Sequence, residues 1–247
     1  MAPAEIVQLQ NVQMQFGRHA VHKDINFKIY ESEVVTLLGP SGTGKTVILK
    51  MIIGLLFPTG GTVQVMGQDL NKLNDEELVK LRSNIGMLFQ GAALFDSLTV
   101  FENIAYPLRE KGVTSEEEIA HIVKDRLSLV GLPEVEQKSP PSLSGGQKKR
   151  VGLARALATS PKVMLFDEPT TGLDPTATRL IGDLILKLKN EYGITSFVVT
   201  HDIDTAKRIS DRWILLNQGL VVADGTVKDL TSNNKQVIEF IDGHWQD

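Results

Sequence analysis

The stretch GPSGTGKT at residues 39–46 matches the phosphate-binding pattern G-x-x-x-x-G-K-[ST] at every fixed position. Its glycines let consecutive backbone N–H groups turn toward phosphate oxygens, while Lys45 supplies a positive charge and Thr46 a hydroxyl for Mg²⁺. The apolar run at residues 34–38 is typical of a buried strand entering such a loop, and residues 47–56 are predicted to form the helix leaving it. A chance glycine-rich turn is the alternative, which the flanking strand and helix disfavour. The chain is therefore predicted to bind a nucleoside triphosphate.

Length and composition limit the other functions that the chain can have. A chain of 247 residues can bury a sizeable core as one large domain or two small ones. Its net charge of -4 gives no global electrostatic reason to expect nucleic acid as a partner. Because there are no cysteines, disulfides and thiolate metal sites are excluded, and a cofactor must be held by oxygen and nitrogen ligands.

No segment of the sequence is predicted to enter a membrane. The N-terminus lacks a basic region followed by an apolar run, so no secretory signal is expected. The longest apolar stretch, at residues 47–57, contains Lys50 and falls short of the roughly 20 residues that a spanning helix needs. A role at a membrane would therefore come through a partner protein.

The apolar pattern divides the chain into strand-rich and helix-rich parts. Alternation over residues 6–30 predicts antiparallel strands, with a bend or bulge at Gln10 and Asn11, where the phase changes. Residues 99–158 are predicted to be helical, because each helix start carries a capping signal. Apolar strands then alternate with helices, which predicts a mostly parallel sheet containing residues 163–166, 194–200 and 213–216. These patterns predict an α/β fold.

Two adjacent carboxylates follow the predicted strand at residues 163–166. A phosphate-loop enzyme needs a second carboxylate site for Mg²⁺, and Asp167 is the metal-side candidate while Glu168 is the candidate that activates water. Such a pair beside bound phosphate is costly unless a cation is present. The alternative is that Asp-Glu-Pro only ends a strand and starts a loop.

A second candidate phosphate site lies at residues 143–147, which read LSGGQ. Two consecutive glycines weaken the start of a helix by roughly 1 kcal/mol each, so something is expected to approach the backbone closely. A helix N-terminus with the Ser144 hydroxyl and glycine N–H groups is suited to phosphate. One ATP cannot readily be held by both sites of one compact domain, so this site is a candidate for a partner subunit's nucleotide. The alternative is an ordinary capped helix.

In the order of these motifs the chain resembles the nucleotide-binding subunits of ATP-binding cassette (ABC) transporters. The resemblance covers nearly the full length and includes Gln90 after a strand, Gly172-Leu173-Asp174, and His201 after another strand. It implies a P-loop NTPase (RecA-like) core with an N-terminal antiparallel β subdomain and an inserted α-helical subdomain. The implied single domain spans residues 1–247, with the core at 1–90 and 159–230, the helical part at 91–158 and a C-terminal tail at 231–247.

By position, the resemblance implies that the chain binds ATP and Mg²⁺. Phe16 would stack on adenine with Val21 close by, although a core strand residue is the alternative for Phe16. Glu168 would polarise the attacking water, and His201 would sense the γ phosphate, although a capping or solvated histidine is the alternative. The Mg²⁺ ligands would be Thr46, Gln90 and Asp167. The implied nucleotide contacts are Phe16, Val21, Gly39, Pro40, Ser41, Gly42, Thr43, Gly44, Lys45, Thr46, Gln90, Ser144, Gly145, Gly146, Gln147 and Asp174.

In this family two subunits pack head to tail. Ser144 to Gln147 of one subunit would then close on the ATP held by the phosphate loop of the other, and Asp174 would lie near the interface. This arrangement would make ATP the clasp of a homodimer that loosens on hydrolysis.

Two segments, at residues 88–110 and 238–243, resemble the ATPases of Mla-type lipid transport systems. The resemblance implies phospholipid cargo, an MlaE-like permease, an MCE-domain lipid carrier, a small regulatory subunit, and a location on the cytoplasmic face of the bacterial inner membrane. Leu94 and Phe95 are predicted to belong to a socket for a helix of the permease, while Phe101 and Tyr106 are expected in the helical core.

Other readings remain open at this stage. The ATPase could serve a transporter for amino acids, metals or lipoproteins, because such subunits share every ATP motif. A soluble ABC protein of DNA repair or translation is a further alternative, but the long coiled-coil insertion or paired cassettes typical of that class are missing from the sequence. A module that binds ATP without hydrolysing it is the last, and Glu168 and His201 argue against it.

Overall fold

The computed structural model describes residues 3–244, and the strands within them form one ten-stranded mixed sheet. The strands are β1 (Glu5–Phe16), β2 (His19–Tyr30), β3 (Val34–Leu38), β4 (Gly60–Val65), β5 (Gln68–Asp69), β6 (Ile85–Leu88), β7 (Val163–Asp167), β8 (Thr195–Val199), β9 (Arg212–Asn217) and β10 (Leu220–Thr226). Their order across the sheet is β5-β4-β1-β2-β10-β9-β3-β8-β7-β6.

The parallel half of the sheet forms the centre of the molecule. Strands β9, β3, β8, β7 and β6 pair in parallel, and every residue of β3, β7 and β8 is buried. Strands covered on both faces are expected to be mostly apolar, as these sequences are, with Thr36, Asp167, Thr195 and Ser196 as the buried polar exceptions. In β7, Val163 and Leu165 pack into one core while Met164 and Phe166 pack into another. The carboxyl ends of β3, β7 and β8 therefore meet at one edge of the sheet.

The other half of the sheet is antiparallel, with β1 pairing with β2 and β4, and β4 with β5. The predicted irregularity at Gln10 and Asn11 is confirmed, because Asn11 has a positive φ of 49° and the β1–β2 register shifts between Leu9 and Val12. Strand β10, which the apolar pattern does not predict, joins the two halves of the sheet. It is antiparallel to β9 and pairs in parallel with β2 at Leu220 and Asp24.

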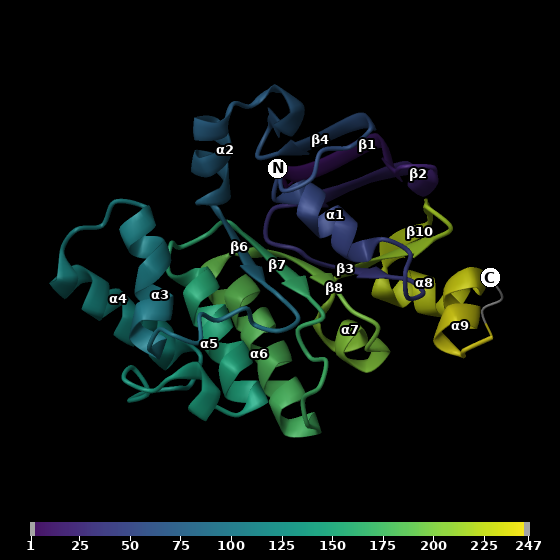
Figure 1. Cartoon of the computed structure of the whole chain (residues 1–247). Helices are drawn as coiled ribbons and strands as arrows, with labels where there is room; N and C mark the ends of the chain where they lie inside the picture. The colour runs from purple at the N-terminus through teal and green to yellow at the C-terminus, as the bar shows by residue number, and fades with distance from the viewer. Residues whose placement is uncertain (1–2, 245–247) are drawn as a thin grey trace.

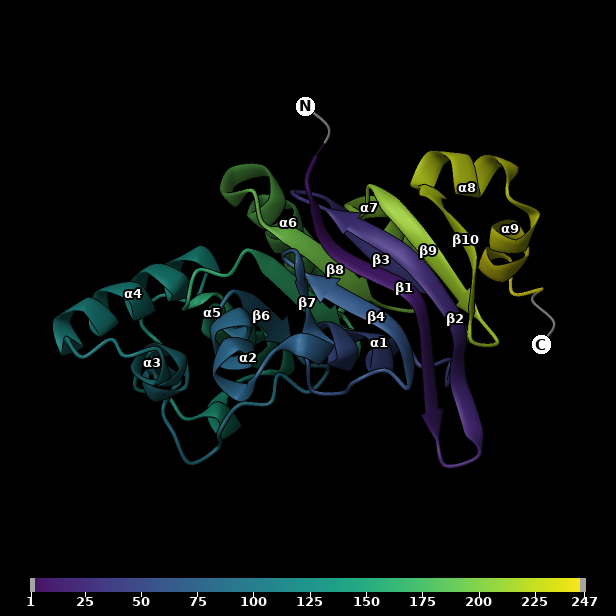
Figure 2. The same cartoon turned by 90° about the horizontal axis from the view of Figure 1, so that it is seen from above.

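Helices cover both faces of the parallel strands (Figures 1 and 2). Helix α1 lies between the antiparallel strands and the parallel ones, whereas α5, α6 and α7 lie on the opposite face and α3 and α4 project at one end (Figure 1). The helices are α1 (Lys45–Ile52), α2 (Asp75–Arg82), α3 (Val100–Glu110), α4 (Glu116–Leu129), α5 (Gly145–Leu157), α6 (Pro175–Tyr192), α7 (Ile203–Ile209), α8 (Val227–Asn233) and α9 (Lys235–Ile241), with short 3₁₀ turns at Leu70–Lys72 and Pro140–Ser142.

Helix α1 is shorter than the helix predicted at residues 47–56. It ends at Ile52, because Gly54 follows with a left-handed φ of 70° that turns the chain out of the helix. Its apolar residues Ile48, Leu49, Met51 and Ile52 are completely buried between the two halves of the sheet. The helix is thus enclosed on both sides, which fixes the phosphate loop at its start.

The predicted C-terminal tail at residues 231–247 begins inside α8 and contains α9, and both helices pack near β10 (Figure 1). Val237 of α9 is buried in an apolar cluster with Trp213, and Phe240 packs against the same cluster. Residues 245–247 of the predicted tail lie outside the described residues. None of the helices in residues 3–244 is both long and apolar enough to cross a membrane. The parallel core, the antiparallel β portion and the inserted helices together confirm the predicted α/β fold class.

Candidate functional site

The glycine-rich loop at residues 39–44 links the end of β3 to the start of α1. Gly39, Gly42 and Gly44 all have positive φ, and Gly44 is the N-cap of α1 at φ 88°. A Cβ at Gly39 would lie 2.3 Å from the carbonyl oxygen of Leu216, and one at Gly44 would lie 2.5 Å from Cγ1 of Val21. Larger residues are therefore excluded by contact as well as by conformation, and the loop presents its backbone at a helix N-terminus, where anions bind.

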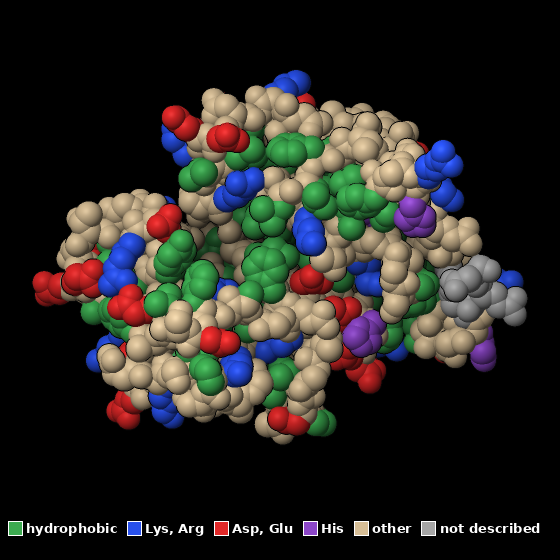
Figure 3. Space-filling view, viewed as in Figure 1, with side chains coloured by type: hydrophobic (Ala, Val, Ile, Leu, Met, Phe, Trp, Pro, Cys, Tyr) green, Lys and Arg blue, Asp and Glu red, His purple; other side chains and the backbone are tan. Residues whose placement is uncertain are grey.

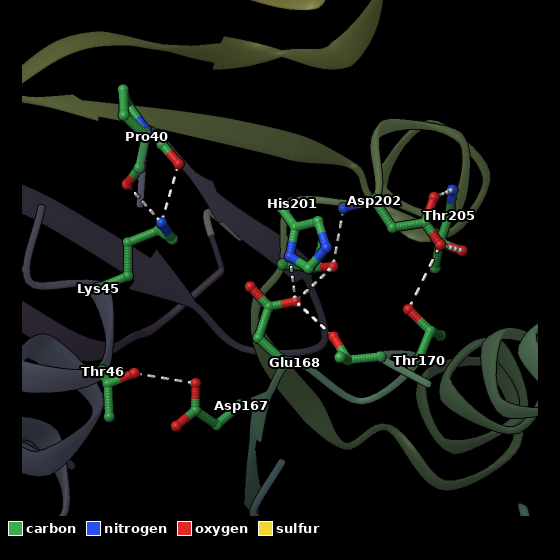
Figure 4. A network of polar contacts seen from close by, with 12 residues as sticks. Pro40, Lys45, Thr46, Asp167, Glu168, Thr170, His201, Asp202 and Thr205 are labelled. Carbon is green, nitrogen blue, oxygen red and sulfur yellow. Dashed lines mark hydrogen bonds and ion pairs between the residues drawn. The ribbon is translucent and has the colours of Figure 1, made fainter. Parts of the chain in front are cut away.

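Lys45 is a buried lysine that folds along this loop. Its Nζ donates to the carbonyl oxygens of Gly39 and Pro40, each at 2.8 Å (Figure 4). Burial lowers the pKa of Lys45, while the carboxylates of Glu168 and Asp167 act in the opposite direction. The Lys45 ammonium group therefore lies against the loop, where its N–H donors face the backbone carbonyls of Gly39 and Pro40.

Asp167, the last residue of β7, faces Thr46 at the start of α1. The Thr46 hydroxyl donates to Oδ1 of Asp167 at 3.1 Å (Figure 4). Burial raises the pKa of Asp167, and the hydrogen bond from Thr46 acts against that rise. A buried carboxylate beside a hydroxyl oxygen is an arrangement that a hard cation such as Mg²⁺ would stabilise.

Glu168 is held by the end of β8 on the neighbouring strand. Its backbone N–H donates to the carbonyl of Val199 at 2.8 Å, and its φ of 49° is unusual for a residue with a side chain. Its Oε2 lies 2.9 Å from Nδ1 of His201 and accepts hydrogen bonds from the hydroxyls of Thr171 and Thr200, each at 3.2 Å (Figure 4). The structure therefore brings the two predicted catalytic residues into contact.

His201 is an exposed residue, and the helix cap at this point is Asp202 rather than His201. Its side chain is 65% exposed, yet one ring nitrogen faces Glu168. The next residue, Asp202, caps α7 by accepting from the N–H of Thr205 and also accepts from the hydroxyl of Thr170 (Figure 4). These bonds anchor the segment that carries His201 over the edge of the sheet.

The predicted residues Gln90, Phe16 and Val21 lie on other elements, and of these Val21 is the one with a contact to the loop. Gln90 is exposed two residues beyond β6, whose Leu88 pairs with Phe166, so it leaves the sheet beside the strand that ends in Asp167. Phe16, at the end of β1, is 48% exposed, which excludes the alternative of a core residue. Val21 lies against Gly44. An exposed aromatic ring on the strand next to Val21 is positioned for stacking on a flat base.

The LSGGQ segment starts α5 at a separate hollow. Ser144 and Gln147 form a capping box, in which Gln147 N–H donates to the Ser144 hydroxyl at 3.3 Å and Ser144 N–H donates to the Gln147 side chain at 2.9 Å. The alternative of an ordinary cap accounts for these two residues but does not explain Gly145, where a Cβ would come no closer than 4.0 Å to Leu173. The hollow measures about 440 Å³, and its lining comes from residues 144–147, 150, 172–174, 176, 177 and 180.

Asp174 belongs to the rim of the same hollow. Its carboxylate caps α6 by accepting from the backbone N–H groups of Thr176 and Ala177, both at 2.9 Å. Gly146 faces this helix, and a Cβ there would lie 3.2 Å from Cβ of Ala177. The structure therefore places Asp174 and the LSGGQ segment together, with two helix N-termini opening onto one concave surface.

A separate apolar groove lies between α2, β6 and α3. It measures about 650 Å³ and includes the half-exposed rings of Phe95 and Tyr106, whose centroids are 5.3 Å apart. Figure 3 shows hydrophobic side chains gathered in this region, with charged side chains around them. Phe101 packs against the helical core as expected, but the expectation for Tyr106 is wrong, because its ring turns outward to Phe95.

Asn103 and Arg155 hold the loop that carries Phe95 into this groove. The buried Asn103 side chain accepts from Phe95 N–H at 2.8 Å and donates to the carbonyls of Phe95, Leu98 and Thr99. The Arg155 guanidinium donates to the carbonyls of Ala92 and Ala93 and lies 5.9 Å from the centre of the Phe95 ring. The loop that presents Phe95 is thus held in one conformation.

Several residues of the site were not predicted from the sequence. Thr171 and Thr200 bond the Glu168 carboxylate, Lys149 bonds the Glu168 backbone, and His22 is buried beneath Gly44. Only Thr200 carried a local signal, as a hydroxyl directly between an apolar strand and His201. The other contacts join residues that are distant in sequence.

Comparison with known proteins identifies one matching family model, described as "ABC transporter", over residues 22–171. The chain is 40% identical over 238 residues to the "Probable ribonucleotide transport ATP-binding protein mkl" of Mycobacterium leprae (strain TN), covering 96% of this chain and 69% of that protein. It is 36% identical over 239 residues to the "Intermembrane phospholipid transport system ATP-binding protein MlaF" of Haemophilus influenzae (strain ATCC 51907 / DSM 11121 / KW20 / Rd), covering 96% and 90%.

The chain is also similar to a further relative and to a solved structure. The "Methionine import ATP-binding protein MetN" of Corynebacterium jeikeium (strain K411) is 42% identical over 219 residues, covering 88% of this chain and 59% of that protein. A dimeric ATP-binding cassette solved in a post-hydrolysis state with ADP and Pi has a TM-score of 0.83 and 39% identity, covering 90% of this chain and 99% of that one. The similarity is thus close to equal among proteins with different named cargoes.

Proposed function

The chain belongs to the ABC transporter family, whose ATP-binding cassettes are ATP hydrolases, and we propose that it powers a transporter of phospholipid between the inner and outer bacterial membranes. The match confirms the family predicted from the motifs. One observation carries the proposal of hydrolysis at this site: the phosphate loop, the buried Asp167 and the Glu168–His201 pair converge at the carboxyl ends of β3, β7 and β8.

The loop residues would bind the phosphates of ATP. Lys45, whose donors now meet the carbonyls of Gly39 and Pro40, would contact the β and γ phosphates, and Phe16 would stack on adenine. Thr46, Asp167 and Gln90 would hold Mg²⁺ directly or through water. When bound, this cation would neutralise charge on the phosphates. The 3.1 Å contact between Thr46 and the buried Asp167 fits such a cation, because it brings two oxygen ligands together.

Glu168 and His201 would act on the water that attacks the γ phosphate. Their 2.9 Å contact, together with the Thr171 and Thr200 hydroxyls, fixes the position of the carboxylate. Glu168 would orient and polarise the water, and His201 would support the γ phosphate. Phosphoryl transfer depends mainly on such positioning and on electrostatic stabilisation.

Two copies of the chain would share two ATP molecules. The phosphate loop and the hollow at Ser144 would be separate anion-binding surfaces, because the hollow contains none of residues 39–46. In a head-to-tail dimer, the Ser144 hollow of one copy would close over the ATP on the loop of the other. Loss of the γ phosphate would weaken this bridge and open the dimer.

The apolar groove with Phe95 and Tyr106 would receive a segment of the permease. A groove of about 650 Å³ with two adjacent exposed aromatic rings has the properties of a protein contact surface. An MlaE-like permease with an MCE-domain lipid carrier and a small regulatory subunit would complete the complex. The chain would then be held peripherally at the cytoplasmic face of the inner membrane.

Support for phospholipid cargo comes from residues 88–110 and 238–243 and from the H. influenzae relative, 90% of which is covered by the match. A different small-molecule cargo is the second candidate, because the relatives named for ribonucleotide and methionine transport are 40% and 42% identical. These ATPases share the same ATP site, so the choice depends on the permease.

The ATPase proposal is tested with Glu168→Gln and a matched control, Glu117→Gln, which changes an exposed glutamate of α4. We expect Mg-ATPase activity in wild type and the control, and a fall of about 100-fold or more in Glu168→Gln, as for loss of a general base. Equal, near-zero ATPase rates in wild type and Glu168→Gln would contradict the ATPase proposal.

The dimer proposal is tested by size exclusion of the same Glu168→Gln protein with ATP. Closure should persist when hydrolysis stops, so this variant should elute as a dimer with ATP and as a monomer without it. A monomer under both conditions, alone and with the permease, would refute the shared site.

The cargo proposal is tested on the complex purified with its native permease. We expect phospholipid among the bound small molecules, and ATPase activity in proteoliposomes that transfers labelled phospholipid to an acceptor carrier. Activity stimulated by methionine or ribonucleotides, with no phospholipid transferred, would instead support the second candidate.

A further inference from the structure

Lys149 is a buried lysine on α5 that reaches the backbone of Glu168. Lys149 is only 5% exposed, and its Nζ donates to the carbonyl oxygen of Glu168 at 2.9 Å. The neighbouring Lys148 on the same helix is half-buried. A lysine is rarely buried without a specific partner, so this contact calls for an explanation.

The backbone that Lys149 holds is unusual. Glu168 has φ 49°, a left-handed conformation that is costly for a residue with a Cβ. Its N–H is bonded to the carbonyl of Val199 on β8, and its carbonyl is bonded to Lys149 on α5. Two separate elements therefore secure the two sides of this residue, and they determine where its carboxylate points.

Two opposing electrostatic effects act on Lys149. Burial lowers the pKa of Lys149, while the carboxylates of Glu168 and Asp167 act in the opposite direction. A charged donor forms a stronger hydrogen bond to a carbonyl oxygen than a neutral one does. Lys149 thus combines a directed bond with partial neutralisation of the two carboxylates.

Helix α5 connects this contact to the second phosphate site. It begins at Ser144 and Gly145, in the hollow proposed to face the partner's ATP, and Lys149 follows within its second turn. A short rigid helix therefore has one end at one ATP and a side chain on the glutamate that would act on the other ATP.

We infer that Lys149 is a positioning residue that holds the Glu168 carboxylate in place and couples it to the helix that closes on the partner's nucleotide. This inference rests on the proposed function, because it assumes that Glu168 serves ATP hydrolysis in a head-to-tail dimer. Closure of the Ser144 hollow would be transmitted along α5 to the Glu168 backbone. Hydrolysis at each site would thus depend on closure at the other.

The test compares Lys149→Met with Lys148→Met in the full-length protein, and the readouts are kcat and KM for ATP. Methionine has a similar length but no donor. We expect Lys149→Met to lower kcat by about 10-fold or more, which corresponds to loss of about one charged hydrogen bond, with KM within about twofold of wild type. Lys148→Met should keep both values, and Lys149→Gln, which retains a shorter neutral donor, should give an intermediate kcat.

A second readout separates positioning of Glu168 from damage to the Ser144 site. In the Glu168→Gln background, adding Lys149→Met should leave the ATP-dependent dimer intact. Loss of that dimer would overturn the inference, as would a kcat equal to that of Lys148→Met, or a rise in KM that accounts for the whole defect.

Failure of the inference can be told apart from failure of the proposed function. If wild type itself hydrolyses no ATP, the proposed function fails; if wild type is active and Lys149→Met matches it, only the inference fails. If Lys149→Met does not fold, Lys149→Gln is compared with Lys148→Gln. A lower kcat at unchanged KM supports the inference, and a kcat equal to wild type overturns it.

Discussion

His22 makes the stability of this protein sensitive to mild acid. It lies on β2 beneath the phosphate loop, only 1% exposed, and both of its ring nitrogens lack a hydrogen-bond partner among the described residues. A Cβ at Gly44 would lie 2.6 Å from its Cε1, so the ring packs directly against the loop. Burial lowers the pKa of His22 from 6.5 to about 4, opposed by the backbone of Gly44.

The size and direction of the effect follow from proton binding in the two states. Between the two pKa values the unfolded chain holds a proton on this residue and the folded chain does not, so the free energy of unfolding falls as pH falls. At about 1.4 kcal/mol per pH unit, lowering the pH from about 7.5 to about 5 costs the folded state about 2 kcal/mol. That is a large part of the 5–15 kcal/mol, roughly, by which domains are stable.

The assay is urea unfolding followed by circular dichroism at these two pH values, with wild type and His22→Leu. Leucine occupies a similar volume and does not titrate, and all other titrating groups are common to both proteins. We expect wild type to lose about 2 kcal/mol more than His22→Leu between the two pH values. The control His19→Gln, at an exposed position on the same strand β2, should behave like wild type. Equal losses in wild type and His22→Leu would refute the reasoning.

Other substitutions test the remaining contacts. Lys45→Ala should weaken ATP binding in calorimetry by about 10-fold or more through loss of a charged contact, and an unchanged Kd would contradict its role. Asn103→Ala leaves the carbonyls of Phe95 and Leu98 without this donor, so it should lower the free energy of unfolding by about 2 kcal/mol. The variant should also copurify less with the permease while ATP binding is retained. Normal copurification would argue against the groove as the permease site. Deleting residues 231–247, which removes Val237 from the Trp213 cluster, should leave ATP binding intact but weaken the dimer or the complex; unchanged assembly by size exclusion would make the tail a local packing element.

Features that depend on neighbouring residues could be predicted from the sequence. The spacing of the glycines, Lys45 and Thr46 predicts the phosphate loop, because the loop consists of a few consecutive residues. The change of phase at Gln10 and Asn11 predicts the irregularity seen in β1. Capping signals also act within one turn, and Thr99, Ser115 and Ser144 all cap helices in the structure. The end of α1 differs from its prediction: the helix ends at Ile52 rather than at residue 56, because the apolar run in the sequence continues past Gly54.

Contacts between distant residues were decided only by the tertiary structure. The ordering of β6, β7, β8 and β3 places Thr46 beside Asp167 and places His201 beside Glu168, whereas the sequence indicates only that each residue follows a strand. The same holds for Lys149 on Glu168, because no local pattern says which face of a helix meets which strand. The candidate phosphate loop could thus be predicted from the residues alone, because it is a short backbone motif. The relative positions of Thr46, Asp167, Glu168 and His201 follow from strand order and helix packing, which are properties of the whole fold.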